Sequence, residues 1–222
     1  MTFQWLDVSS PAPAVVPQPR VIVPIGQSGK ALIVGGTRGI GAALVERLLF
    51  YGWEVTATGR KDFDIGIPGT WLLWWSRQPK NIEYDLVVFC AGELVPQAWS
   101  EKTLDDYLRA YAIHAAGPLV FLGQNKQHFP WWTTVVFLST VGATNAGVVD
   151  LSYSCGKIAL HKAAKALREH ESWNVVLVEL DLVRTGMLAL LPVDTLHGRP
   201  IMEPEEAAEL ILDRAGVRPF IP

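Results

Sequence analysis

The sequence predicts an α/β fold in which a doubly wound parallel sheet lies between two layers of helices. Short apolar runs rich in Val, Leu and Phe alternate with longer segments of helical periodicity. The apolar runs show no alternation with polar residues, which is typical of strands covered on both faces. A glycine-rich turn directly follows the first run. Together these observations predict β-α units wound around one sheet, in three layers.

The predicted elements follow one another along the chain with short connections. The strands are expected at residues 31–34, 54–58, 85–90, 133–138 and 175–180. The helices have apolar residues at helical spacing. They are expected at residues 40–51, 104–124, 152–170 and 204–215. Residues 20–25 and 218–221 are candidates for further short edge strands.

The connection after the second strand is unusually short. Too few residues lie between Arg60 and Asp64 for a crossover helix, so residues 63–65 are expected to form at most a stub of a third parallel strand. The next segment, 68–78, carries tryptophans at positions i, i+3 and i+4, which favour packing in the core. A subunit contact is the alternative, and a membrane-surface helix lacks the basic face it needs. These tryptophans are Trp71, Trp74 and Trp75.

Composition and charge restrict the classes of function. A length of 222 residues fits a single domain. We expect this domain at 30–222, after a proline-rich arm at 1–29. A net charge of −3 argues against nucleic acid as a partner. Cys90 and Cys155 are too few for a disulfide framework, and no metal site is expected. Neither a signal peptide nor an apolar run of about 18 residues is visible, so we expect a cytoplasmic protein that does not enter membranes.

The glycine-rich turn at 35–41 has the spacing G-x-x-x-G-x-G. Its first glycine permits a tight turn, its second lets the backbone approach a pyrophosphate, and its third lets the helix lie close to the sheet. The helix N-terminus then presents free N–H groups to phosphate. Between a strand and a helix, such a turn predicts the dinucleotide site of a Rossmann-like fold. The residues expected to contact the dinucleotide here are Gly35, Thr37, Arg38, Gly39, Ile40 and Gly41.

Two arginines favour a phosphorylated dinucleotide. A carboxylate after the second strand would bind a ribose 2′-hydroxyl, but Arg60 stands there, and Arg38 on the turn can reach the same place. Two guanidinium groups around one phosphate form charge-assisted hydrogen bonds. We therefore expect NADP(H) rather than NAD(H), with solvated surface charges as the alternative interpretation of these arginines.

Tyr153 and Lys157 lie one helical turn apart within 152–170. The unperturbed pKa of a phenol is about 10, which makes it a poor base near neutral pH. A nearby ammonium favours the phenolate, so we expect Lys157 to lower the pKa of Tyr153. The pair then predicts a proton shuttle beside the dinucleotide, for hydride transfer to or from a carbonyl.

These residues resemble the short-chain dehydrogenase/reductase family over nearly all of 30–222. Tyr153 and Lys157 match its signature, and the glycine turn matches its cofactor motif. The resemblance assigns further cofactor contacts to a pair of an aspartate and a hydrophobic residue, to the end of the fourth family strand and to a late loop. These contacts are Asp64, Ile65, Cys90, Ala91, Gly92, Val183 and Thr185.

The resemblance implies an NADP(H)-dependent oxidoreductase that acts on a small-molecule carbonyl or secondary alcohol. Tyr153 would be the acid or base, and Lys157 would hold the nicotinamide ribose. A hydroxyl from Ser139 or Thr140 would bind the substrate oxygen, and Thr140 has the family spacing to Tyr153. Family members commonly pair through their two long helices, here 104–124 and 152–170, so a homodimer or homotetramer is expected.

The sequence departs from the family at three places. His114 replaces a catalytic asparagine and is either a proton relay that titrates near neutral pH or a satisfied helix histidine. Cys90 replaces a second asparagine, and Leu180-Asp181 replaces Pro-Gly, which places a carboxylate near the nicotinamide. The departures leave open a noncatalytic NADP(H)-binding sensor or interaction module, and a related reaction such as enoyl reduction. The apolar segment 186–202 suggests an apolar or aromatic carbonyl as substrate.

Overall fold

The computed structural model describes residues 29–143, 150–191, 196 and 198–217. Within them one sheet has the strand order β2-β1-β3-β4-β5, and every neighbouring pair is parallel. The strands are β1 (Lys30–Val34), β2 (Glu54–Thr58), β3 (Leu86–Phe89), β4 (Thr134–Thr140) and β5 (Asn174–Leu180). The predicted parallel sheet is confirmed, and its strand order reverses between β1 and β3, where ligands bind in such folds.

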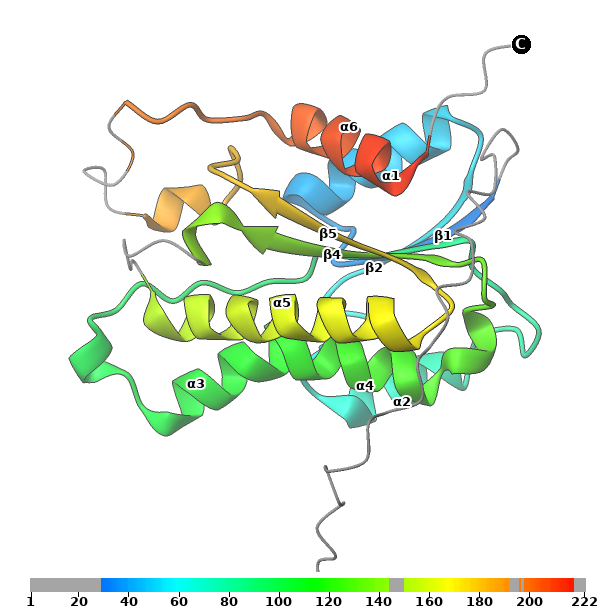
Figure 1. Ribbon diagram of the computed structural model, residues 1–222, viewed down its shortest axis with the longest axis horizontal. Coiled ribbons are helices and arrows are strands. Elements are labelled where there is room, and N and C mark those ends of the chain that lie inside the picture. Colours follow the sequence, from blue (N-terminus) through cyan, green and yellow to red (C-terminus); the bar gives the residue numbers. More distant parts are fainter. Residues whose placement is uncertain (1–28, 144–149, 192–195, 197, 218–222) are drawn as a thin grey trace, which may run out of the picture.

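Helices cover both faces of the sheet and complete three layers (Figure 1). One face carries α1 (Gly39–Phe50) and α6 (Pro204–Ala215). The other face carries α2 (Pro68–Trp75), α3 (Leu104–Tyr111), α4 (Gly117–Gln124) and α5 (Leu151–His170). Short 3₁₀ turns lie at Trp99–Glu101, Lys126–His128, Val141–Ala143 and Leu188–Leu190. Within the described part of the chain, no helix combines the length and apolar character that crossing a bilayer requires.

The core consists of two apolar clusters, one on each face of the sheet. Strand β1 shows why its sequence does not alternate. Leu32 packs into the cluster under α2 to α5, and Ile33 packs into the opposite cluster under α1 and α6. Both side chains are fully buried. Because each face of the strand is covered, every position along it favours an apolar residue.

The tryptophans of α2 pack in the core, as predicted. Trp71 and Trp75 are buried, and Trp74 packs at the edge of the same cluster. Their rings meet those of Phe63 and Phe121 at centroid distances of 5.3 to 5.7 Å. Helix α2 is thereby fixed as the crossover between β2 and β3.

The predicted strand stub at 63–65 is wrong, because this segment forms a turn. The Asp64 N–H donates to the Thr70 hydroxyl at 3.0 Å, and the Gly66 N–H donates to the Asp64 carboxylate at 2.9 Å. The backbone donors are therefore satisfied locally, without a neighbouring strand. Of the other predicted edge strands, 20–25 and 218–221 lie outside the described residues, as do residues 1–28 of the predicted arm.

The helix predicted over 104–124 is divided by a π-helical turn, Ala112–Ala116. Pro118 follows this turn and has no N–H to donate to the carbonyl of His114, so the regular hydrogen-bond ladder fails there. At Gly117 an added Cβ would lie 2.3 Å from the Ile65 carbonyl oxygen, so the helix approaches the 63–65 turn closely. The wide turn places His114 on the inner side of the helical rod. Such π-turns occur frequently at functional sites.

The close contact between the glycine turn and α1 predicts that one added methyl group at Gly41 destabilises the fold. An added Cβ at Gly41 would lie 2.1 Å from the Gly35 carbonyl oxygen. We expect Gly41→Ala to lower the free energy of unfolding, measured by urea denaturation, by about 1–3 kcal/mol because the backbone must shift.

The matched control is Gly123→Ala, in α4, where an added Cβ meets nothing within 4 Å. Alanine has the higher helix propensity, so this variant is expected to be equal to the wild type or up to about 1 kcal/mol more stable. Equal stabilities of the two variants would contradict the predicted contact.

Candidate active site

The glycine turn lies at the carboxyl edge of the sheet, against loops from two other strands. Gly35 has φ +88°, and its N–H donates to the Thr58 carbonyl at 2.9 Å. A Cβ at Gly35 would lie 2.5 Å from the Ala91 nitrogen, and one at Gly39 would lie 3.1 Å from the Thr185 methyl group. The turn, the loop after β3 and the loop after β5 therefore meet at one place.

The N-terminus of α1 provides a place for an anion. Arg38 is its N-cap residue, but no side chain caps the helix and no acidic residue lies in its first turn. The first N–H groups of a helix have no partner within it and favour negative charge. Thr37 packs on Gly59, so this end of the turn is adjacent to Arg60. These features fit a dinucleotide phosphate.

Three predicted catalytic side chains come together beside the turn. Asp150 caps α5 by accepting from the Tyr153 N–H at 3.2 Å. The rings of Tyr153 and His114 meet edge to face with centroids 4.8 Å apart. The Lys157 Nζ lies 5.6 Å from the centre of the Tyr153 ring. The π-turn of the α3–α4 rod and the first turns of α5 thus form one cluster.

Lys157 is 6 % exposed, and its Nζ donates to the Leu138 carbonyl at 2.7 Å. Burial lowers its pKa to about 8. Burial, and then the charge of Asp150, raises the pKa of Tyr153 to about 12. The predicted lowering of the phenol pKa by Lys157 is therefore wrong, because desolvation of the phenolate dominates. At neutral pH the phenol holds its proton and can donate it.

His114 is 2 % exposed, and its Nε2 lies 2.9 Å from the Glu93 carbonyl oxygen. A carbonyl only accepts, so Nε2 carries the proton and Nδ1 is the free acceptor. Nδ1 is buried and has no hydrogen-bond partner among the described residues. Burial, and then the charge of Lys157, lowers the pKa of His114 to about 3. The predicted relay that titrates near neutral pH is wrong, and so is the fully satisfied histidine. The ring is a neutral acceptor.

The two candidate hydroxyl groups have different surroundings. The Ser139 Oγ lies 2.6 Å from the His161 Nε2, on the face of β4 that α5 covers. Neighbouring residues of a strand face opposite sides, and Thr140 is half-buried at the strand end. The Thr140 Oγ1 accepts from the Gly142 N–H at 3.2 Å and can still donate its own proton. This geometry favours Thr140 as the substrate-binding hydroxyl.

Comparison with known proteins finds structural relatives only. No protein-family model matches the sequence, and no curated protein matches it. A small-chain dehydrogenase solved in complex with NADPH has 16 % identity and a TM-score of 0.74, over 88 % of this chain and 94 % of that one. The chain has the short-chain dehydrogenase/reductase fold.

Two further solved structures agree. A short-chain dehydrogenase family protein from Francisella tularensis subsp. tularensis SCHU S4 has 16 % identity and a TM-score of 0.71, over 85 % of this chain and 91 % of that one. A short-chain dehydrogenase from Burkholderia cenocepacia J2315, in complex with NADP, has 22 % identity and a TM-score of 0.67, over 84 % of each chain. The predicted resemblance is confirmed for the fold.

Two departures from the dehydrogenase/reductase pattern leave the cluster intact. Cys90 lies near Lys157, and burial raises the pKa of its thiol to about 12, so the thiol is neutral. The Asp181 carboxylate forms an ion pair with Arg199. This carboxylate is thus engaged by an arginine side chain.

The expected adenine ligand, Asp64, and the expected phosphate ligand, Arg60, each form an ion pair with a residue of another element. Arg109 binds the Asp64 carboxylate through both of its terminal nitrogens, at 3.0 and 2.6 Å. Arg60 binds Glu93 at 2.8 Å. Sequence reasoning missed Glu93 and Arg109, because nothing local to either residue marks a partner on another element. Arg38 is exposed on the glycine turn.

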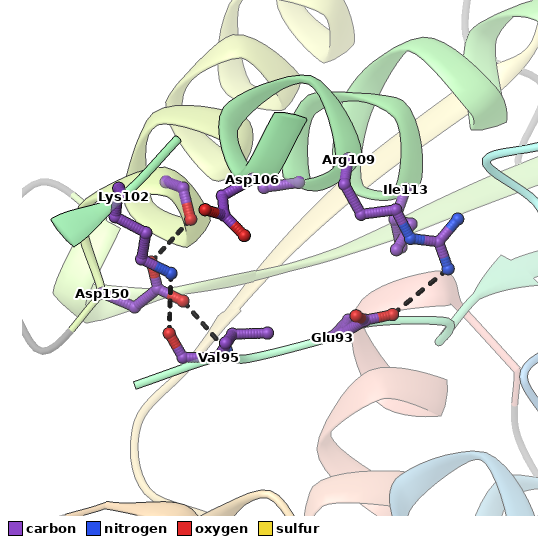
Figure 2. Close-up of a pocket in the computed structure, with 9 residues that line it drawn as sticks. Glu93, Val95, Lys102, Asp106, Arg109, Ile113 and Asp150 are labelled. Carbon is purple, nitrogen blue, oxygen red and sulfur yellow. Dashed lines mark hydrogen bonds and ion pairs between the residues drawn. The ribbon is translucent and has the colours of Figure 1, made fainter. Parts of the chain in front are cut away.

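A second missed group fixes the start of α5. Figure 2 shows the Asp150 carboxylate bound to Lys102 and to the Val95 N–H, at 3.1 and 3.0 Å. Both side chains of the ion pair are almost fully buried, beside a cavity of about 40 Å³. The signal was visible in the sequence, because an aspartate three residues before Tyr153 is a favourable N-cap.

The buried neutral imidazole predicts a loss of stability in acid. The folded pKa of His114 is about 3, below its ordinary 6.5, so the unfolded chain binds the proton first as the pH falls. Above pH 6.5 the neutral imidazole does not reduce the free energy of unfolding. As the pH falls from 6.5 towards 3, protonation of His114 in the unfolded chain lowers that free energy. We expect His114→Gln to flatten the dependence of unfolding free energy on pH between 6.5 and 4, by up to roughly 1.4 kcal/mol per pH unit.

The control is His170→Gln, at the exposed end of α5. Chemical denaturation at a series of pH values measures all three proteins. The prediction fails if the pH dependence of His114→Gln is as steep as that of the wild type and of the control.

Proposed function

We propose that the chain is an NADP(H)-dependent oxidoreductase that moves a hydride between nicotinamide and a carbonyl or secondary alcohol. The observation that carries this proposal is the cluster of Tyr153, Lys157 and the unpartnered Nδ1 of His114, beside the glycine turn. A protein that only binds a nucleotide has no need of a proton donor there. Solved neighbours with NADPH or NADP bound support the same cofactor.

The residues at the sheet edge fit the dinucleotide. The glycine turn and the uncapped α1 terminus would hold the pyrophosphate, and Arg38 and Arg60 would hold the 2′-phosphate. The adenine and nicotinamide ends would use residues from the three neighbouring loops. These are Asp64, Ile65, Cys90, Ala91, Gly92, Val183 and Thr185. When bound, NADP(H) supplies the hydride chemistry. NAD(H) is the weaker candidate, because Gly59-Arg60 follows β2 where a carboxylate would bind the 2′-hydroxyl.

The side chains have distinct roles in this proposal. Tyr153, protonated at neutral pH, donates its proton to the carbonyl oxygen, while the Thr140 hydroxyl donates a hydrogen bond to the same atom. The Lys157 ammonium stabilises the phenolate that remains. Because the pKa of Lys157 is about 8, this amine can also return a proton to Tyr153 near neutral pH. His114 accepts a hydrogen bond through Nδ1 and keeps its single ring proton on Nε2, so it transfers no proton itself.

The substrate side of the site is apolar in this proposal. The Met187 methyl group lies beside Gly92, within 3.5 Å of where a Cβ would stand, and the His114 ring lies at 3.3 Å from the same point. A methionine adapts to irregular apolar shapes. An apolar or aromatic carbonyl therefore suits this side of the cluster.

Removal of the phenol hydroxyl tests the proposed chemistry. We expect Tyr153→Phe to lower kcat/KM about 10²–10⁴-fold with a panel of aldehydes and ketones, because proton donation is lost. NADPH binding is expected to stay within about twofold. Nicotinamide absorbance follows turnover, and calorimetry follows binding.

Tyr111→Phe is the control, on the exposed face of α3. Full activity in Tyr153→Phe would exclude this tyrosine as the acid. A wild type that binds NADPH and reduces no carbonyl in the panel would favour the second candidate, a noncatalytic NADP(H)-binding module. The bond of Lys157 to the Leu138 carbonyl is the observation that favours that candidate, because it engages the ammonium that the proposed chemistry needs at Tyr153.

We also propose that the chain pairs through the layer that contains α3 and α5. These helices pack side by side (Figure 1), and their outer face exposes apolar side chains. The most exposed of these are Leu104, Leu108, Tyr111 and Ile158. A homodimer or homotetramer would cover them. The cytoplasmic location suggested by composition stays a prediction.

One substitution tests whether the exposed apolar face of α3 and α5 is a subunit contact or a free surface. We expect the wild type to sediment as a dimer or tetramer at micromolar concentration, and Leu108→Glu to sediment as a monomer, because the charge cannot be buried at a contact. Leu72→Glu, on the exposed side of α2, is the control and keeps the assembly. A monomeric wild type would overturn the proposal.

A further inference from the structure

We infer that the Glu93 carboxylate is an internal competitor for the cofactor's 2′-phosphate. It holds Arg60, and a 2′-phosphate that binds Arg60 must break this pair. Glu93 is therefore a specificity-determining residue that weakens the preference for the 2′-phosphate, since a 2′-phosphate competes with the carboxylate for Arg60 and a 2′-hydroxyl does not. The inference rests on the proposed function for the identity of the cofactor.

A continuous chain of ion pairs carries the argument. The Glu93 Oε2 lies 2.8 Å from the Arg60 Nη2 and 3.2 Å from the Arg109 Nη2. Arg109 in turn binds Asp64 through two hydrogen bonds. Two carboxylates thus balance two guanidinium groups, and the group as a whole is close to neutral.

The position of the Arg60–Glu93 pair is informative. Arg60 follows β2, and Glu93 lies in the loop after β3. These strands flank β1 on its two sides. The ion pair therefore bridges the carboxyl end of β1, where the glycine turn begins. That is the crevice in which the adenosine part of a dinucleotide binds in this class of fold.

The two halves of the network differ in strength. The Arg60 side chain is 64 % exposed and the Glu93 side chain 29 %, and a pair this exposed to solvent contributes at most about 1 kcal/mol. The Arg109–Asp64 pair is bidentate and less exposed. The bond to Arg60 is thus the one that opens.

Opening leaves no charge without a partner. When Arg60 turns to a phosphate, Glu93 still has Arg109, and Asp64 keeps both of its bonds. A phosphate offers the guanidinium charge-assisted hydrogen bonds equal to those it loses. A neutral hydroxyl forms no such charge-assisted bonds, so a dinucleotide without the 2′-phosphate cannot replace Glu93 as the partner of Arg60.

The side chain of Glu93 can be changed without disturbing the catalytic cluster. Only its backbone carbonyl holds His114. Glu93→Gln therefore removes the charge that binds Arg60 and keeps the backbone contact. Glu83→Gln removes the same charge near the opposite end of β3, from an exposed position, and is the matched control.

Calorimetry with two adenosine fragments tests the inference without turnover. The probes are 2′,5′-ADP, which carries the 2′-phosphate, and 5′-AMP, which lacks it. We expect Glu93→Gln to bind 2′,5′-ADP about 3- to 5-fold more tightly than the wild type, as loss of one exposed ion pair implies. Binding of 5′-AMP should stay within about twofold, and Glu83→Gln should match the wild type. Glu93→Ala should likewise tighten the binding of 2′,5′-ADP and leave that of 5′-AMP within about twofold, and it serves if the amide variant does not fold.

Three results would overturn the inference. Unchanged or weaker binding of 2′,5′-ADP by both Glu93 variants shows that the carboxylate is no competitor, and leaves the proposed cofactor standing. Equal tightening of both ligands shows that the ion pair merely covers the crevice. If neither the wild type nor the variants bind 2′,5′-ADP, the proposed NADP(H) function itself fails, and the inference fails with it.

Discussion

The bond from the buried Lys157 ammonium to the Leu138 carbonyl is the constraint around which the site is organised. A buried cation is costly without a partner, and here its partner comes from a central strand that the core holds rigidly. The ammonium is thereby fixed near the Tyr153 ring, and its charge adds to the burial that lowers the pKa of His114. Burial is the main cause of the protonation states of the cluster, and the anchored amine reinforces it at His114.

A second constraint runs from a local sequence feature to the cofactor side of the site. Pro118 breaks the helical ladder and the chain widens into a π-turn, which places His114 where its Nε2–H meets the Glu93 carbonyl. That bond fixes the loop after β3, and the Glu93 side chain on the same loop reaches Arg60. One loop residue thus touches both the catalytic cluster and the expected phosphate ligand, through different atoms.

The sequence predicted what depends on local pattern. Apolar runs, the glycine turn and the Tyr153–Lys157 spacing each depend on a few neighbouring residues. The parallel sheet that was predicted from the apolar runs and the glycine turn is confirmed. The pKa of Tyr153 could not be predicted, because its direction depends on burial by other elements. The contact of Ser139 with His161 and the pairing of Arg60 with Glu93 were equally out of reach, since each joins residues on separate elements. The 63–65 turn was missed because its hydrogen bonds depend on Thr70, in the next helix.

The pKa values also show which form of Tyr153 is present before the proposed reaction. A phenol whose pKa is raised to about 12 is a full proton donor at neutral pH, which suits delivery of a proton to a carbonyl oxygen. The reverse reaction needs the phenolate, which in this environment forms only with a charged neighbour. Lys157 is such a neighbour, but its own pKa of about 8 means that it loses its charge as the pH rises towards values that would ionise the phenol. The phenol of Tyr153 therefore starts protonated, which is the state from which the proposed reduction of a carbonyl begins. A bound cofactor that drew Lys157 from the Leu138 carbonyl towards Tyr153 would stabilise the phenolate and lower the pKa of Tyr153.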